Sequence, residues 1–179
     1  MEQTSPHERL RLFLALQLPD DVVEALAAWQ GRHLRGRLVP PTNLHVTLAF
    51  LGSRPAGELD SICTVLAEAA ATVSPPLLSG GRYRETRSVG MLAFSDDTGN
   101  GALLAGRLHE GLAALGVYEP EHRPWLPHVT VLRYRERPRL STQPPELSAF
   151  APSGAAVYLS LLHPTGALYE VLESFPLNH

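Results

Sequence analysis

The chain has 179 residues, of which 44% are hydrophobic and 18% are charged, a balance typical of a soluble globular protein with one domain or two small lobes. Its formal net charge of −3 excludes proteins that hold nucleic acid through a general positive field. An anionic partner would need a local cluster of basic side chains, and all fifteen basic residues are arginines.

Strands and helices alternate along the chain. Residues 9–18 pass from alternating Arg and Leu into an apolar run, which predicts a strand that becomes buried. Residues 20–34 have helical spacing of apolar side chains, and 44–52 predict a second strand that ends at Gly52. The remaining predicted elements are a helix over 56–73, two strands within 77–96, a helix over 102–116, a strand over 128–135 and two strands within 155–177.

The order of these elements lacks the glycine-rich turn from strand to helix that marks a dinucleotide-binding fold. Each half of the chain contains a strand, a helix and a further strand with the triplet His-Val-Thr. This local repeat predicts a duplicated lobe with approximate two-fold symmetry.

The two His-Val-Thr triplets each stand within an apolar segment. Side chains at i and i+2 of a strand point to the same face, so His45 lies beside Thr47 and His128 beside Thr130, while the valines face the core. If the two strands face each other, two imidazoles and two hydroxyls meet in one small volume. Imidazole can give or take a proton near neutral pH, and a hydroxyl can donate to a phosphate oxygen. The triplets therefore predict phosphoryl transfer by acid–base catalysis.

A single histidine in a strand is usually a hydrogen-bonded core residue, but two copies with identical neighbours favour a shared site. A metal site is disfavoured, because the sequence has no His-x-His or His-Glu-x-x-His spacing and no carboxylate within either triplet. The sequence therefore predicts a reaction that uses neither a metal ion nor another cofactor.

With both triplets in view, the chain resembles the 2H phosphoesterase superfamily, whose signature is a pair of His-x-Thr/Ser-x motifs. Within it, the chain is similar to the bacterial and archaeal RNA 2′,3′-cyclic phosphodiesterases, historically called 2′-5′ RNA ligases. The resemblance rests on RLFLALQLP, NLHVTLAFLG, RPWLPHVTVLR and the last two strands. It implies a bilobal, pseudo-two-fold symmetric α+β fold, with two antiparallel β-sheets facing each other across a central cleft and helices on the outside. Residues 1–179 would then form one 2H phosphoesterase domain in which each lobe carries one motif.

The resemblance also implies metal-independent hydrolysis of an RNA or nucleoside 2′,3′-cyclic phosphate to the 2′-phosphate, together with reversible RNA 2′-5′ ligation by the same groups. His45 corresponds to the acid that protonates the departing 3′ oxygen, and His128 to the base that activates water. Thr47 and Thr130 correspond to phosphate-binding residues. On the sequence alone the two histidines are interchangeable, so their assignment as acid and base rests on the resemblance.

Two arginines flank the second motif and are predicted to bind phosphate. Arg123 lies in the loop that leads into the motif. Arg133 lies three residues after Thr130, so a regular strand turns it to the opposite face, and it would have to reach the phosphate from the strand end. An exposed arginine without a ligand is the alternative for Arg133.

Base recognition needs an aromatic ring or a planar guanidinium against the base. Tyr83, in a predicted loop that is rich in arginine, is the candidate for base stacking, and a solvated loop residue is the alternative. Trp125 also lies near a predicted strand end. Phe50 lies three residues after Thr47, which predicts the opposite strand face and a place in the core.

The expected partners are RNA ends or nucleotides that carry a 2′,3′-cyclic phosphate, and we expect a monomer without an obligate protein partner. No apolar stretch approaches the ~20 residues of a membrane span, and no small-residue cleavage site follows the apolar N-terminal run, so we expect a cytoplasmic protein. A different class of function is a non-catalytic module that binds RNA ends or nucleotides in the same cleft. Within the superfamily, ADP-ribose cyclic phosphate and oligoadenylates are alternative substrates.

Overall fold

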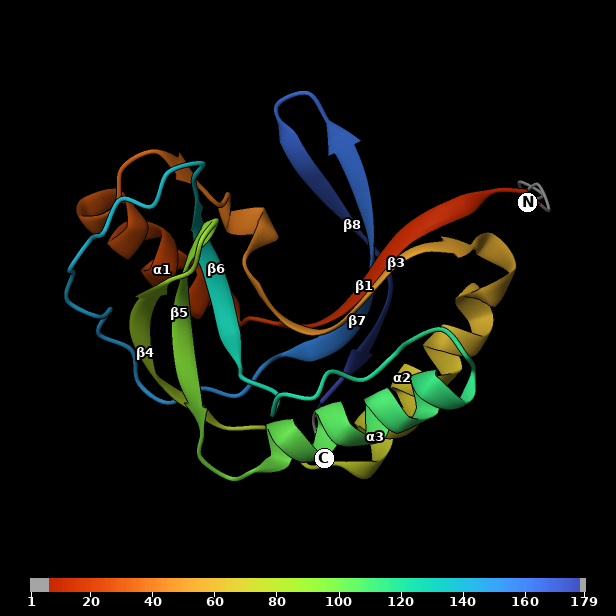
Figure 1. Cartoon of the computed structure of the whole chain (residues 1–179). Coiled ribbons are helices and arrows are strands. Elements are labelled where there is room, and N and C mark those ends of the chain that lie inside the picture. The colour runs from red at the N-terminus through yellow and green to blue at the C-terminus, as the bar shows by residue number, and fades with distance from the viewer. Residues whose placement is uncertain (1–6, 178–179) are drawn as a thin grey trace.

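The computed structural model describes residues 7–177, which contain eight strands and three α-helices (Figure 1). The strands form two antiparallel sheets of four strands: sheet A has the order β3-β1-β7-β8, and sheet B has the order β2-β6-β5-β4. The strands are β1 Arg9–Gln17, β2 Arg37–Leu38, β3 His45–Pro55, β4 Leu78–Glu85, β5 Val89–Asp96, β6 His128–Arg133, β7 Gly154–His163 and β8 Gly166–Pro176. The helices are α1 Asp20–His33, α2 Leu59–Thr72 and α3 Asn100–Ala114. The predicted α+β fold with two antiparallel sheets is confirmed.

The helices lie on the outer sides of the two sheets (Figure 1). Helices α2 and α3 lie beneath sheet A, while α1 packs against sheet B, where the rings of Trp29 and Tyr83 are 6.2 Å apart. Helical stripes of apolar residues are buried against the sheets, as the sequence spacing predicts. Within residues 7–177, none of the helices has the length and apolar character needed to cross a membrane.

The two sheets do not correspond to the two halves of the chain. Sheet A joins β1 and β3 to the C-terminal hairpin β7–β8, and sheet B takes β2 and β4 from the N-terminal half. Helix α1 follows a strand of sheet A but covers sheet B. An arrangement in which each half of the chain builds its own lobe is therefore not what forms, although each sheet holds one motif, at the start of β3 and of β6.

The main core lies between the sheets and the helices. Leu12, Leu14 and Leu16 of β1 have no exposed surface and belong to one apolar cluster with the α2 stripe. Burial stabilises each of these side chains by about 1.5–3 kcal/mol relative to an exposed position. Because alternate residues of a strand face opposite sides, Phe13 and Ala15 point to the other face of sheet A, toward the cleft described below.

Strand β3 continues past Gly52, where the sequence predicted its end. Gly52 has a φ of 70°, and Leu51 has no partner on β1, so the register shifts by one residue. Glycine adopts this left-handed conformation at little cost. The strand therefore passes through a β-bulge and continues to Pro55.

Candidate active site

A cleft between the two sheets brings the predicted motifs together. Strand β3 is the edge strand of sheet A and lies against β6 of sheet B. A cavity of about 420 Å³ opens there, with walls from both sheets. Its lining residues are Arg11, Phe13, His45, Thr47, Phe50, Thr130, Arg133, Ser160, Leu162, Ala167 and Tyr169. His128 begins β6 and lies on the same strand face as Thr130.

Both histidines are held by the same local hydrogen bond. Nδ1 of His45 lies 2.7 Å from the carbonyl oxygen of Asn43, and Nδ1 of His128 lies 2.9 Å from that of Leu126. A carbonyl oxygen only accepts, so each Nδ1 carries a proton, and Nε2 is the nitrogen left for exchange. In His45 this Nε2 lies 3.0 Å from the Thr47 hydroxyl, which donates to it when the ring is neutral.

Aromatic rings surround His45 on the cleft side of sheet A. Their centroids lie 4.9, 5.6 and 6.1 Å from the imidazole centroid in Phe13, Tyr169 and Tyr158. Burial among these rings removes water from the charged imidazole and lowers the pKa of His45 from 6.5 to about 4. The Asn43 carbonyl opposes this shift, while the charges of His128 and Arg133 add to it. Without a ligand, the His45 ring is therefore neutral at neutral pH.

A β-bulge in β3 turns Phe50 into the cleft. Thr47 and Ala49 pair with consecutive residues of β1, so Leu48 is left without a partner. The extra residue shifts the alternation of side chains by one: Leu48 and Ala49 are both buried, and Phe50 joins Thr47 in the cavity wall. The prediction of a core position for Phe50 is therefore wrong. Its ring is 50% exposed, and the Arg11 guanidinium lies 4.9 Å from the ring centroid.

A bulge in β6 likewise turns Arg133 into the cleft. Thr130 and Leu132 pair with consecutive residues of β5, so Val131 has no partner on that strand. Val131 and Leu132 are both buried, and Arg133 joins Thr130 in the cavity wall. The bulge explains why Arg133 does not face away from Thr130, as a regular strand would require. Phe50 and Arg133 thus hold equivalent positions, each five residues after a motif histidine.

A side chain from a helix binds the carbonyl of each bulge. In sheet A, Nε2 of His109 on α3 donates to the carbonyl oxygen of Leu48 over 2.7 Å. In sheet B, the side-chain amide of Gln30 on α1 donates to the carbonyl oxygens of Val131 over 2.8 Å and Val39 over 3.1 Å. Gln30 is only 2% exposed, so its hydrogen bonds form away from water. The two bulges therefore share a means of support as well as a position in the motif.

Trp125 links the two motifs. From the loop that leads into His128, its indole Nε1 donates to the carbonyl oxygen of Thr47 over 3.0 Å. The ring packs on the start of α3, where a Cβ added to Gly101 would lie 2.8 Å from it. Residue spacing cannot predict this hydrogen bond, because it joins residues 78 positions apart.

Two of the predicted contact residues, Arg123 and Tyr83, do not line the cavity between the motifs. The Arg123 side chain is 84% exposed and pairs with Glu121 at 3.2 Å. Tyr83 belongs to β4 rather than to a loop, and its register puts it on the helix side of sheet B, opposite to His128. No contact in the described residues supports phosphate binding by Arg123 or base stacking by Tyr83.

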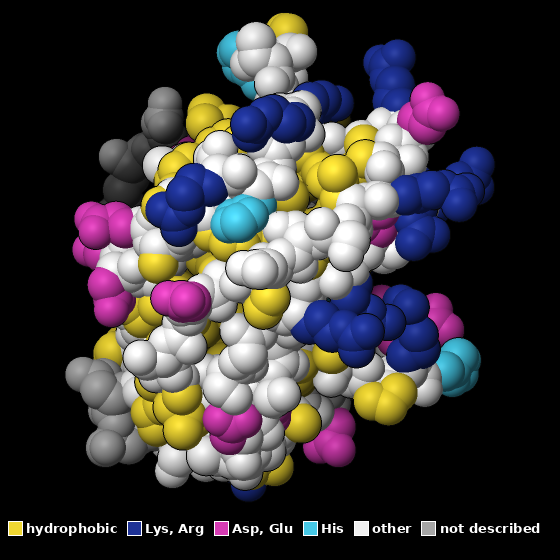
Figure 2. All heavy atoms as spheres, turned by 90° about the vertical axis from the view of Figure 1, so that its left-hand side faces the viewer, with side chains coloured by type: hydrophobic (Ala, Val, Ile, Leu, Met, Phe, Trp, Pro, Cys, Tyr) yellow, Lys and Arg dark blue, Asp and Glu magenta, His cyan; other side chains and the backbone are white. Residues whose placement is uncertain are grey.

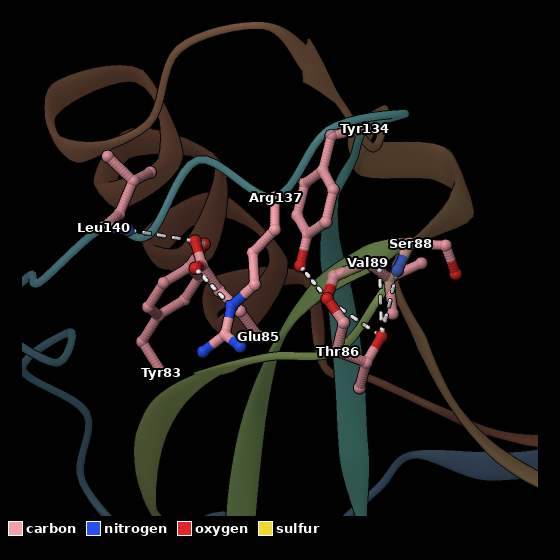
Figure 3. Close-up of polar contacts among 8 residues, drawn as sticks. All are labelled: Tyr83, Glu85, Thr86, Ser88, Val89, Tyr134, Arg137 and Leu140. Atoms are coloured by element: carbon pink, nitrogen blue, oxygen red, sulfur yellow. Dashed lines mark hydrogen bonds and ion pairs between the residues drawn. The ribbon is translucent and has the colours of Figure 1, made fainter.

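Tyr83 instead belongs to a polar network around Glu85 (Figure 3). The Glu85 carboxylate accepts hydrogen bonds from the Tyr83 hydroxyl at 2.8 Å, from Nε of Arg137 at 3.3 Å and from the amide of Leu140 at 3.1 Å. Burial opposes ionisation of Glu85, but these donors outweigh it and lower its pKa. The network holds residues 134–149, here called the strap, against the β4–β5 hairpin.

The cleft residues form a set suited to phosphate chemistry. Two imidazoles can transfer protons, two threonine hydroxyls can donate hydrogen bonds, and Arg133 can neutralise negative charge. Among the residues that the structure describes, no three His, Cys, Asp or Glu side chains are grouped so that they could hold a metal ion.

Comparison with known proteins agrees with this chemistry. Residues 16–80 match the family described as LigT-like phosphoesterase. The RNA 2′,3′-cyclic phosphodiesterase of Thermus thermophilus is 36% identical over 186 residues, which cover 94% of this chain and 91% of that protein. The Escherichia coli protein of the same name is 33% identical over 134 residues, covering 70% and 73%. The crystal structure of E. coli LigT complexed with 3′-AMP has a TM-score of 0.80 at 27% identity, covering 96% of this chain and 100% of that one. The chain therefore belongs to the LigT-like phosphoesterases of the 2H phosphoesterase superfamily.

Proposed function

We propose that the protein hydrolyses the 2′,3′-cyclic phosphate of RNA ends or nucleosides to a 2′-phosphate, without a metal ion. The observation that carries the proposal is one cavity lined by His45 and Thr47 from sheet A and by Thr130 from sheet B, with His128 close enough for its charge to act on His45. The names of the relatives, RNA 2′,3′-cyclic phosphodiesterase, support the substrate class. Both motifs come from one chain, so we propose that residues 1–179 act as one domain and as a monomer.

In the proposed reaction, the cyclic phosphate lies between the two imidazoles. Thr47 and Thr130 donate to its non-bridging oxygens, and Arg133 offsets the charge that develops on them. Nε2 of His128 takes a proton from water, whose oxygen attacks phosphorus, and the bond from phosphorus to the 3′ oxygen breaks. Nε2–H of His45 gives its proton to that oxygen. The products are a 3′ hydroxyl and a 2′-phosphate, and the proton gained by His128 returns to solvent.

This assignment requires His45 to be protonated when substrate is bound. The ring is neutral in the ligand-free protein, because its pKa is about 4. An anionic phosphate beside Nε2 favours the charged imidazole and raises the pKa. Substrate binding would therefore load the acid with its proton, from solvent, before the chemical step.

The same groups support ligation when a 5′ hydroxyl of a second RNA replaces water. His128 takes the proton of that hydroxyl, its oxygen attacks phosphorus, and His45 again protonates the departing 3′ oxygen. The product is a 2′-5′ phosphodiester, and the reverse reaction exchanges the roles of the two histidines.

The direct test is incubation with 2′,3′-cyclic AMP in EDTA, followed by separation of 2′-AMP from 3′-AMP. We expect 2′-AMP at a rate that EDTA does not change. Binding of the nucleotide without turnover would favour the non-catalytic module, and loss of turnover in EDTA would contradict a metal-independent reaction. Release of 3′-AMP would contradict the assignment of the 3′ oxygen as the leaving group. If kcat/KM is higher for ADP-ribose cyclic phosphate or an oligoadenylate than for 2′,3′-cyclic AMP, that compound is the better candidate for the substrate.

A further inference from the structure

The cleft-facing side of sheet B carries arginines beyond the motif. In β4 and β5, Arg82 pairs with Ala93, which in turn pairs with His128 of β6. Directly paired residues of neighbouring strands point to the same face. Arg82 therefore lies on the face of the catalytic histidine, two strands away, or roughly 10 Å at the usual strand spacing.

A second row runs parallel to the first. Arg84 pairs with Met91, and Met91 pairs with Thr130. Arg82 and Arg84 thus extend the face of the phosphate site toward the β4 edge. Both side chains are exposed, and within residues 7–177 neither is within ion-pair distance of a carboxylate. Figure 2 shows arginine side chains gathered on one part of this side of the molecule, next to a hollow in its outline.

A cavity of about 710 Å³ lies at the end of these rows. Arg82, Ala93 and Ser95 line it from the cleft face of the sheet, and Tyr83 lines it from the opposite face, so the cavity reaches around the β4 edge. The strap lines it on the other side with hydroxyl and apolar side chains. The lining includes one carboxylate, Glu146. The strap is fastened to the hairpin through Glu85, so the cavity has a fixed outer wall (Figure 3). A space of this size and mixed polarity fits an unstacked nucleobase.

We propose that Arg82, Arg84 and the strap cavity bind the single-stranded RNA that precedes the cyclic phosphate, so that the protein favours RNA ends over mononucleotides. The inference rests on the proposed function, because it takes the cyclic phosphate as lying between His45 and His128. A cyclic phosphate occupies the 3′ end, so the remaining RNA leaves the cleft in one direction only. Arg82 and Arg84 lie on the same sheet face as His128, so their charges can meet the phosphates of this RNA. Such local binding needs no positive net charge, and the chain carries −3.

The test compares wild type with the double variant Arg82→Gln/Arg84→Gln. The matched control, Arg32→Gln/Arg107→Gln, removes two exposed charges from the outer helices α1 and α3. One readout is the ratio of kcat/KM for a pentaribonucleotide 2′,3′-cyclic phosphate to that for 2′,3′-cyclic AMP. The other is the salt dependence of Kd for a fluorescent pentaribonucleotide that ends in a 2′-phosphate.

We expect the Arg82/Arg84 variant to lower the kcat/KM ratio and the RNA affinity by about tenfold. The slope of log Kd against log salt should fall by about 1.4, because each phosphate contact to a single strand contributes about 0.7. The control should keep the wild-type ratio and slope. An unchanged ratio and slope in the Arg82/Arg84 variant, or an equal loss in the control, would overturn the inference. Failure of wild type to hydrolyse both 2′,3′-cyclic AMP and the pentaribonucleotide cyclic phosphate would refute the proposed function instead, while the salt slope would still decide the RNA contact.

Discussion

At the scale of single residues, His45 and His128 use the same backbone contact but differ in environment. Each Nδ1–H donates to the carbonyl oxygen two residues earlier, which orients Nε2 for proton transfer. Around His45, three aromatic rings exclude water, and the pKa falls to about 4. The shared backbone contact therefore orients both rings alike, while the aromatic surroundings lower the pKa of His45.

The first prediction concerns the protonation of His45. Nuclear magnetic resonance titration of the ligand-free protein should show the His45 ring changing protonation near pH 4, below its ordinary value of 6.5. Saturation with 2′-AMP should raise this pKa, because the phosphate anion favours the charged ring, so binding between these pH values takes up a proton. His45→Gln identifies the signal. A bound-state pKa that stays near 4 would remove His45 as the acid at neutral pH.

The second prediction concerns Phe50, which the bulge turns into the cleft beside Arg11. We propose that its exposed ring stacks on the terminal base, since each such contact contributes about 1–3 kcal/mol. Phe50→Leu should raise KM for 2′,3′-cyclic AMP about tenfold or more and change kcat little. The comparison substrate is a small cyclic phosphate without a base, for which KM should not change. An equal loss on both substrates would instead indicate a disturbed strand.

At the scale of secondary-structure elements, the two motif strands share a construction. Each has a bulge one residue after the motif threonine, and each bulge carbonyl accepts from a helix side chain, His109 or Gln30. The bulges return Phe50 and Arg133 to the cleft face. The helices therefore contribute to the site by supporting the strands, and the described cavity lining contains no residue of α1, α2 or α3.

The third prediction tests this support. His109→Leu removes the donor to the Leu48 carbonyl, which should lower the free energy of unfolding by about 1–3 kcal/mol. It should also raise KM, because the bulge at Leu48 would no longer hold Phe50 in the cavity wall. His109→Gln supplies the amide donor that Gln30 provides in the other sheet, and should restore KM. If His109→Leu and His109→Gln show the same KM, His109 is not a positioning residue.

The strand pairing shows which side-chain orientations can be predicted from the sequence alone. His45 with Thr47, and His128 with Thr130, follow from the two-residue alternation of a strand, which holds up to the bulge. The alternation does not predict which strand face Phe50 and Arg133 occupy. A bulge depends on the partner strand, and its extra residue shifts the alternation of side chains by one. The sequence predicts a loop at Tyr83 because the arginine-rich run 82–87 hides the alternation of its strand.

At the scale of the whole molecule, the site depends on how the sheets are joined. The chain alternates between the sheets, with β1 in sheet A, β2 in sheet B, β3 in sheet A, β4–β6 in sheet B and β7–β8 in sheet A. Strands β3 and β6 therefore meet although 83 residues separate their histidines. The fold class was predictable from the repeated motif and its family resemblance. Contacts such as that of Trp125 with Thr47 were not, since they depend on the packing of distant segments.

The fourth prediction concerns this link between the motifs. Trp125→Phe removes the hydrogen bond to the Thr47 carbonyl, which should reduce stability by about 1 kcal/mol and kcat about tenfold. Trp29→Phe is the matched control, because the Trp29 indole also donates to a backbone carbonyl, that of Gln143, at 2.9 Å. The control should lose stability but keep kcat on 2′,3′-cyclic AMP. Equal kcat in the two variants would show that Trp125 is only structural.

The central claim is that the two histidines act together in one reaction. Its most direct test is a double-mutant cycle on hydrolysis of 2′,3′-cyclic AMP, with His45→Ala, His128→Ala and the combined variant. We predict that each single change lowers kcat by about 10²–10⁴-fold. The double variant should have a kcat only a little below that of the less active single variant, because the effects of groups that act as a unit are not additive. Full activity in either single variant, or losses that multiply in the double variant, would contradict the paired mechanism.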